Sequence, residues 1–127
     1  MVTALDRPTR ILVVDDEPLI ADMMVDMLTA EGYHVDTAAN GRLALEKIKQ
    51  QSYELILSDL LMPELDGFEL YRELERCRPD LLRRMIFVSG TTEQYRRFLE
   101  ETGVPILPKP FELEDLRQLT ERALSGF

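Results

Sequence analysis

Four short apolar runs in this chain, rich in Val, Ile and Leu, each lead directly into a polar segment. The runs are continuous rather than alternating, which is typical of strands that are buried on both faces of a parallel sheet. In an open α/β sheet the carboxyl ends of such strands meet at one edge, and ligands bind in the crevice there. We therefore expect three carboxylates, a hydroxyl and an ammonium to converge in one crevice. The residues concerned follow the runs 11–14, 55–57, 85–88 and 106–107, and they are Asp15, Asp16, Asp59, Ser89 and Lys109.

Helical patterns separate the runs, so that strand and helix alternate five times along the chain. Pro18 suits the first turn of the first helix, Gly32 ends that helix, and Asn40 caps the second. The spacing of apolar side chains predicts one buried face on each helix, which includes Met23 in the first helix and Leu113 in the last. Strands are predicted at 11–14, 33–38, 54–59, 85–89 and 104–108, and the last two helices near 92–102 and 112–125.

The order of the strands in the sheet follows from their composition. The first, third and fourth strands are apolar throughout and should be central, whereas 33–38 alternates and should lie at an edge. Pro105 and Pro108 cannot donate hydrogen bonds to a ladder, which places the fifth strand at the other edge. With right-handed crossovers these positions predict an α/β fold of the flavodoxin-like type, a three-layer (βα)5 sandwich with a parallel sheet in the order 2-1-3-4-5.

Length and composition restrict the class of protein. A chain of 127 residues is one domain by length, and we expect a polar leader at 1–9 followed by that domain at 10–127. The net charge of −9 disfavours direct binding to nucleic acid or to an anionic membrane. No apolar stretch reaches the roughly 18 residues of a membrane span, the N-terminus lacks a signal-peptide pattern, and the single Cys77 cannot form an internal disulfide. Together these features predict a cytoplasmic protein.

The expected cluster of acids suits a divalent cation and a phosphoryl group. Carboxylates at close range repel one another unless a cation lies between them, so Asp15, Asp16 and Asp59 imply Mg²⁺, with a loop carbonyl after Asp59 suited to be a further ligand. An aspartate can also attack phosphorus and form an aspartyl phosphate. Lys109 is suited to neutralise the moving phosphoryl group, and Ser89 to donate a hydrogen bond to one of its oxygens.

This arrangement resembles the receiver domain of response regulators in two-component signalling. The resemblance runs from about residue 10 to the end and rests on four stretches in the family's order: Val14 to Glu17, Ser58 to Gly67, Val88 to Gly90 and Pro108 to Phe111. It implies a phosphoacceptor switch rather than an enzyme. In such a switch Asp59 accepts a phosphoryl group from a histidine kinase or a histidine phosphotransfer protein, and the domain then changes its contacts with a downstream protein target. A homodimer is compatible with the resemblance.

The resemblance also implies roles for individual residues. Lys109 and Ser89 would contact the phosphoryl group, and the peptide bond from Lys109 to Pro110 is a candidate for the cis form. Mg²⁺ would be held by four residues, directly by Asp16 and Asp59, through water by Asp15, and by the backbone carbonyl of Leu61.

Three features depart from the family pattern or narrow it. The family usually has Tyr or Phe three residues before the lysine, where this chain has Ile106. Leu61 and Thr91 occupy variable positions that tune the lifetime of the phosphoryl group, and neither aligns a water molecule well, which favours a longer-lived phosphate. The stretch 98–105 resembles the receivers of hybrid histidine kinases.

Other interpretations of the same residues remain open at this point. An aspartyl-nucleophile phosphatase of the haloacid-dehalogenase type also uses an aspartate, although that family spaces its acids as Asp-x-Asp, whereas Asp15 and Asp16 are adjacent. A degenerate receiver that never takes phosphate would be an interaction module only. The acids at 15–17 fit a helix N-cap with first-turn charges, and Ser89 fits a cap of the fourth helix.

Overall fold

The computed structural model describes residues 8–90 and 92–125. A five-stranded parallel sheet in the order β2-β1-β3-β4-β5 runs through its centre. The edge strands are β2, which contains His34, Asp36 and Thr37, and β5, which contains Pro108, so the predicted fold and strand order are confirmed. The strands are β1 Arg10–Val14, β2 His34–Ala38, β3 Leu55–Ser58, β4 Met85–Ser89 and β5 Ile106–Pro108.

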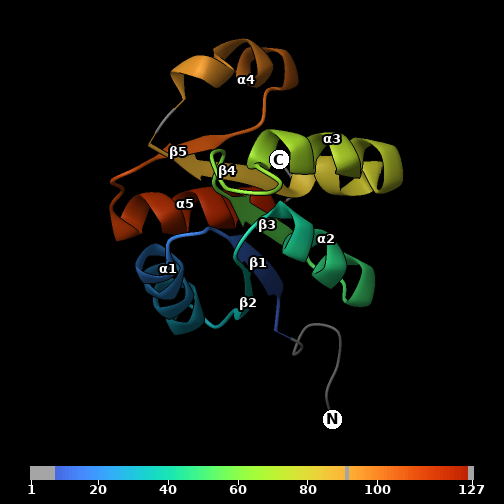
Figure 1. Ribbon diagram of the computed structural model, residues 1–127. Coiled ribbons are helices and arrows are strands. Elements are labelled where there is room, and N and C mark those ends of the chain that lie inside the picture. Colours follow the sequence, from blue (N-terminus) through green and yellow to red (C-terminus); the bar gives the residue numbers. More distant parts are fainter. Residues whose placement is uncertain (1–7, 91, 126–127) are drawn as a thin grey trace.

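Helices cover both faces of this sheet (Figure 1). On one face lie α1 (Pro18–Ala30) and α5 (Leu113–Leu124), and on the other lie α2 (Gly41–Gln50), α3 (Gly67–Cys77) and α4 (Arg96–Thr102). Two short 3₁₀ helices complete the described part of the chain, η1 (Pro79–Arg84) after α3 and η2 (Glu93–Tyr95) directly before α4. None of the helices in the described residues is long and apolar enough to cross a membrane.

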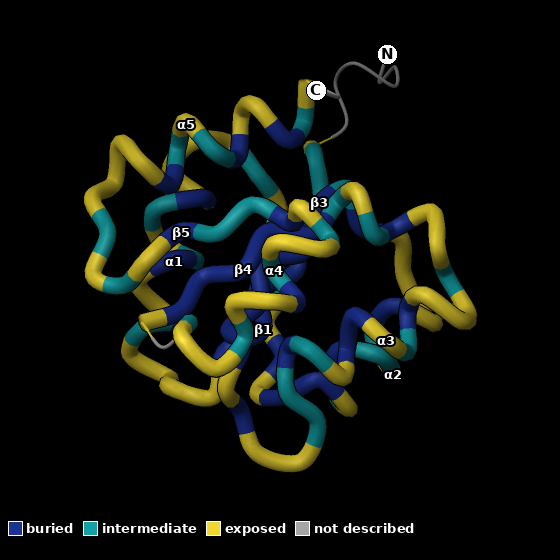
Figure 2. The backbone as a smooth tube through the Cα atoms, turned by 90° about the horizontal axis from the view of Figure 1, so that it is seen from above, coloured by how far each residue is buried: buried dark blue, intermediate teal, exposed yellow. Residues whose placement is uncertain are grey.

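The hydrophobic core has two halves because successive residues of a strand point to opposite faces of the sheet. Leu12 and Val14 pack on the side of α2, α3 and α4, whereas Ile11 and Val13 pack on the side of α1 and α5. Figure 2 shows the buried strands at the centre and exposed residues along the outer helices. The strand ends are therefore held rigidly between two packed layers, which fixes the residues that follow them.

The spacing of apolar residues predicts which face of a helix a residue lies on, but not how deeply it is buried. Two residues that were predicted to be buried are exposed. Met23 of α1 is 37% exposed because it lies beside the buried stripe of Ala21, Met24 and Leu28, and Leu113, which is 49% exposed, is the first residue of α5. The fourth helix begins as 3₁₀ turns at Glu93, and β5 is shorter than expected at its start.

The predicted leader falls almost entirely outside the described residues, since only Pro8 and Thr9 of it are described. The carbonyl of Thr9 accepts a hydrogen bond from the amide of His34 at 2.8 Å. Backbone pairing with β2 therefore already begins at the last residue of the predicted leader. The division at residue 10 stays a prediction.

Candidate functional site

The acids that follow β1 and β3 are fixed by backbone hydrogen bonds that extend the sheet by one residue. The amide of Asp15 donates to the carbonyl of Ala38 at 3.1 Å, and the amide of Asp59 donates to the carbonyl of Val14 at 2.9 Å. Both residues are buried, with 4% and 7% of their surface exposed. Their carboxylates are thus presented at the carboxyl edge of the sheet by buried backbone that is hydrogen-bonded to the neighbouring strands.

Each of these two carboxylates divides its oxygens between the backbone and a cation. Oδ1 of Asp15 accepts from the amide of Glu17 at 2.9 Å, and Oδ1 of Asp59 accepts from the amide of Leu60 at 2.7 Å. Both Oδ2 atoms face Lys109, whose Nζ donates to Asp15 at 2.8 Å and to Asp59 at 3.0 Å. Such charge-assisted hydrogen bonds are the strong ones, so the ammonium ties the ends of β1 and β3 together.

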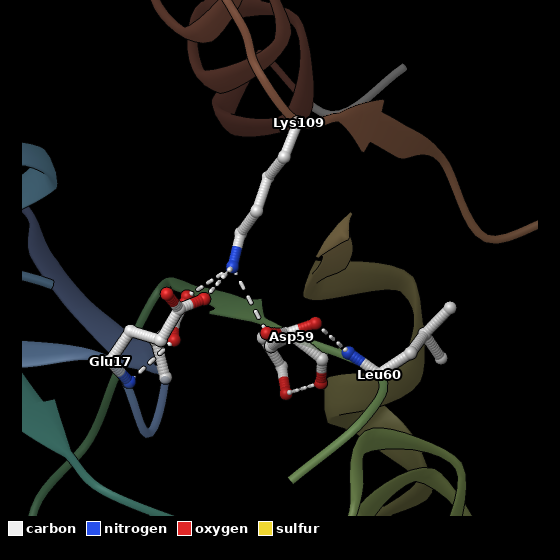
Figure 3. Close-up of polar contacts among 6 residues, drawn as sticks. Glu17, Asp59, Leu60 and Lys109 are labelled. Atoms are coloured by element: carbon white, nitrogen blue, oxygen red, sulfur yellow. Dashed lines mark hydrogen bonds and ion pairs between the residues drawn. The ribbon is translucent and has the colours of Figure 1, made fainter. Parts of the chain in front are cut away.

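Lys109 reaches this position from the end of β5, on the far side of β4 (Figure 3). Its amide donates to the carbonyl of Ser89 at 3.2 Å, and the peptide bond to Pro110 is cis, as the sequence indicated. The side chain is 14% exposed and also lies 3.6 Å from Oε1 of Glu17. The ammonium of Lys109 therefore lies within ion-pair distance of three carboxylates, those of Asp15, Glu17 and Asp59.

Burial and charge act in opposite directions on the ionisation of these groups. Burial raises the pKa of Asp15 above its usual range, although hydrogen bonds from Lys109 and from the amide of Glu17 oppose the shift. Burial alone would lower the pKa of Lys109, but its hydrogen bonds to Asp15 and Asp59 outweigh this, and the pKa lies above its usual value. The lysine is therefore a permanent cation at neutral pH.

The donor atoms at this edge suit a hard divalent cation. Carboxylate oxygens of Asp15, Glu17 and Asp59 lie within 4.8 Å of one another, and Mg²⁺ prefers oxygen ligands of this kind. Glu17 was absent from the predicted ligands, although it is the third acid in a row after β1. Asp16, which was predicted as a direct ligand, is exposed and does not belong to this close group.

A cleft of about 290 Å³ joins all the predicted site residues except Asp15, whose buried carboxylate contacts Lys109. Asp16, Asp59, Leu61, Ser89 and Lys109 all line it, together with Glu17 and Gly90. Ser89 is 2% exposed, and it ends β4 rather than capping the fourth helix, which begins only at Glu93. Thr91, the other predicted variable position, lies outside the described residues. The cleft thus gathers acids, a hydroxyl and an ammonium from β1, β3, β4 and β5.

Comparison with protein families gives a match over nearly the whole described chain. The family model of the response regulator receiver domain matches residues 11–121. The response regulator receiver protein CpdR of Brucella abortus is 34% identical over 119 residues, which cover 91% of this chain and 96% of that protein. Other relatives are longer: the chain covers 47% of the response regulator MprA of Mycolicibacterium vanbaalenii, at 35% identity, and 13% of the sensor kinase CckA of Brucella abortus, at 36% identity.

Solved structures of similar chains superpose closely. The chemotaxis protein CheY4 of Vibrio cholerae superposes with a TM-score of 0.83 at 30% identity, covering 93% of this chain and all of the other. The response regulator TrrA of Thermotoga maritima, solved in complex with Mg²⁺ and BeF, gives 0.80 at 32% identity, covering 91% and 99%. The receiver domain of the sensor histidine kinase PA1611 of Pseudomonas aeruginosa, solved with a magnesium ion in its active-site cleft, gives 0.83 at 29% identity, covering 94% and 100%.

Proposed function

Because the chain belongs to the response-regulator receiver family, whose members are phosphoacceptor switches of two-component signalling, we propose that Asp59 is its phosphorylated residue. The observation that carries the assignment is the contact between Asp59 and Lys109, at 3.0 Å, in a cleft beside a second buried carboxylate. Asp59 combines burial, a fixed backbone and a neighbouring cation. Asp16 and Glu17 line the same cleft but are exposed, so they are held less firmly.

The transfer step needs a nucleophile and compensation of charge. A carboxylate oxygen of Asp59 forms a bond to the phosphorus of a phosphohistidine as the bond from nitrogen to phosphorus breaks, and the imidazole leaves with that electron pair and takes a proton from water. The ammonium of Lys109 then turns from the two carboxylates to a phosphoryl oxygen. The buried hydroxyl of Ser89 donates a hydrogen bond to another phosphoryl oxygen.

Mg²⁺ is the proposed cofactor, because the carboxylate oxygens available here are hard donors and Mg²⁺ keeps other positions for phosphate oxygens. When bound, the ion would neutralise charge on the phosphoryl group and orient it for in-line transfer. Asp15, Asp16 and Asp59, together with the backbone carbonyl of Leu61, are the proposed ligands. Glu17 joins this proposal because its carboxylate lies in the close group.

The proposed donor is a phosphohistidine on a histidine kinase or a histidine phosphotransfer protein, and the proposed output is a contact with a downstream protein. One relative is a response regulator receiver protein and another is a sensor kinase, so both settings occur among similar chains. The cytoplasm is the proposed compartment, since the single Cys77 needs no oxidising environment. Two further statements stay predictions: that the chain does not bind nucleic acid directly, and that it can form a homodimer.

Phosphorylation by a small-molecule donor tests the assignment. The protein is incubated with acetyl phosphate and Mg²⁺, and the intact mass is measured. We expect the wild type to gain one phosphoryl group, with no gain in Asp59→Asn or in the presence of EDTA. The matched control is Asp22→Asn, which removes an exposed carboxylate of α1 and should leave labelling unchanged. Equal labelling of Asp59→Asn and the wild type would overturn the assignment.

The phosphatase alternative is not favoured, because the family match covers residues 11–121 and identifies a receiver domain. We propose that the chain performs single phosphorylation and slow loss of its own phosphate, without turnover of other esters. A small aromatic phosphate ester separates the two functions. Sustained release of phosphate from it, lost in Asp59→Asn, would favour the phosphatase, and a mass unchanged by any donor would favour the degenerate receiver.

A further inference from the structure

We propose that a hydrogen bond from Tyr95 to Asp66 latches the α4 segment, which comprises η2 and α4, to the start of α3 in the unphosphorylated protein. We further propose that phosphorylation of Asp59 breaks this hydrogen bond and so opens the latch. The inference rests on the proposed function, because it concerns the conformational change that follows phosphorylation at the same site. Tyr95 Oη donates to Oδ2 of Asp66 at 3.3 Å. Asp66 lies seven positions after Asp59 and Tyr95 lies six positions after Ser89. The latch therefore joins the two segments that leave the phosphorylation cleft after β3 and β4.

Asp66 gives the latch a firm base. Its Oδ1 accepts the amide of Glu69 at 2.9 Å, and the carboxylate of Glu69 accepts the amide of Asp66 at 3.0 Å, which forms a capping box at the start of α3. The cap occupies one carboxylate oxygen and leaves the other to Tyr95. The next residue, Gly67, donates its amide to the carbonyl of Leu60 at 2.8 Å. The acceptor of the latch is thus tied directly to the backbone beside the phosphoacceptor.

The α4 side of the latch is weakly held, so one hydrogen bond matters there. Phe98 is the only buried residue of α4, and Figure 1 shows this short helix standing off the sheet. Phe98 packs edge-on against Phe68 and Tyr71, with ring centroids 4.8 and 5.1 Å apart. The ring of Tyr95 lies 6.5 Å from that of Phe68. Tyr95 and Phe98 therefore attach α4 chiefly to α3, through one hydrogen bond and three ring contacts, and Phe98 also lies 5.8 Å from the ring of Phe87 in β4.

A segment held by so few contacts has a low free energy of local opening. If Ser89 and Lys109 bond the phosphoryl group on Asp59 as proposed, the chain after β4 shifts relative to the capped start of α3, and the Tyr95 bond is the contact that spans this boundary. Ile106 has no ring that could swing between surface and interior, and its χ1 is stiff. The change consequently passes through η2 and α4 instead of along β5.

Tyr95→Phe tests the latch because it removes the hydroxyl and keeps the ring. By linkage, a bond made only in the resting state weakens the binding of a phosphoryl mimic, and its loss strengthens that binding. We expect Tyr95→Phe to bind beryllium fluoride, in the presence of Mg²⁺, about two- to tenfold more tightly than the wild type, the range expected for one net hydrogen bond. Without the mimic, the amide resonances of residues 96–102 should already be displaced toward their wild-type bound positions, and these amides should exchange hydrogen faster.

Tyr53→Phe is the matched control, because Tyr53 donates an equivalent hydrogen bond to Asp36 at 2.6 Å, away from the cleft. It should alter neither the α4 resonances nor the affinity. A Tyr95→Phe variant with wild-type affinity and wild-type exchange, or a Tyr53→Phe variant that changes equally, would overturn the latch. A wild type that binds the mimic at residues 59–61 while α4 stays unchanged would also overturn the latch and leave the proposed function standing. A wild type whose cleft amides never respond would overturn the proposed function, and with it the latch as its readout.

Discussion

The ammonium of Lys109 lies 3.0 Å from Oδ2 of Asp59. This contact joins the proposed phosphoacceptor to its neighbouring cation. The same nitrogen lies 2.8 Å from Oδ2 of Asp15. The repulsion expected between crowded carboxylates is therefore offset within the protein itself before any metal binds. A divalent cation bound at this site would compete with Lys109 for the same oxygens, and this competition can be measured.

Lys109→Met keeps the aliphatic stem and removes the charge. The pKa of Lys109 is raised in the folded state, so its stabilising contribution is fully present below the unfolded pKa of about 10.4 and is lost as pH rises through the folded value. At pH 7 and without metal, we expect the variant to lose about 1.5–3 kcal/mol of unfolding free energy, as for a hydrogen bond to a charged group. The chain has no Trp, so urea unfolding followed by circular dichroism is the suitable measurement.

Mg²⁺ should raise the stability of Lys109→Met by more than that of the wild type, because the carboxylates then lack their internal cation. Lys49→Met, which removes an exposed ammonium of α2, should behave as the wild type does. A Lys109→Met protein as stable as Lys49→Met, with no greater response to Mg²⁺, would disprove this charge balance.

The raised pKa of Asp15 gives a pH dependence of definite sign. Since burial favours its protonated form in the folded state, the contribution of Asp15 to stability is present below the unfolded pKa of about 3.9 and is lost as pH rises through the folded value. Without metal, the melting temperature of Asp15→Asn minus that of the wild type should therefore increase from pH 4 to pH 7. Asp22→Asn should show no such trend in calorimetry. A difference that shrinks as pH rises would mean that folding makes Asp15 more acidic.

Gly67 is required by the close approach of α3 to the phosphoacceptor. A Cβ at this position would lie 2.3 Å from the carbonyl oxygen of Asp59 and 2.9 Å from Cα of Leu60. Backbone atoms cannot yield as a flexible side chain can, so Gly67→Ala should cost about 1–3 kcal/mol of unfolding free energy and slow labelling by acetyl phosphate. Gly90→Ala, whose added Cβ meets nothing closer than 3.7 Å, is the control for stability. Equal unfolding midpoints for the two variants would refute the steric argument.

The fold was predictable because the amino-acid composition of each strand indicates whether that strand lies at the centre or at an edge of the sheet. Continuous apolar residues predicted the three central strands, and polar alternation or proline predicted the two edges, as the sheet order confirms. The depth of helical residues was not predictable in this way. Periodicity could not distinguish Met24, which is 1% exposed, from Met23, which is 37% exposed, because the difference depends on which side of α1 is turned toward the sheet.

The candidate site was predictable as a set of residues but not as a set of contacts. Strand ends predicted that Asp59, Ser89 and Lys109 would share a crevice, and they line one cleft. The bond from Lys109 to Asp15 joins residues 94 positions apart, and the bond from Tyr95 to Asp66 joins residues 29 apart. Such pairs depend on side-chain rotamers chosen in the folded state, for which the sequence carries no periodic signal.

Identification of the phosphorylated atom tests the central claim most directly. After reaction with acetyl phosphate and Mg²⁺, an aspartyl phosphate can be reduced with borohydride to homoserine, and peptide mass spectrometry then locates the converted residue. We predict homoserine at position 59, with conversion greatly reduced in Lys109→Met and unchanged in Lys49→Met. Homoserine at position 15 or 16 in place of 59, or phosphate recovered on a residue outside the cleft, would contradict the account.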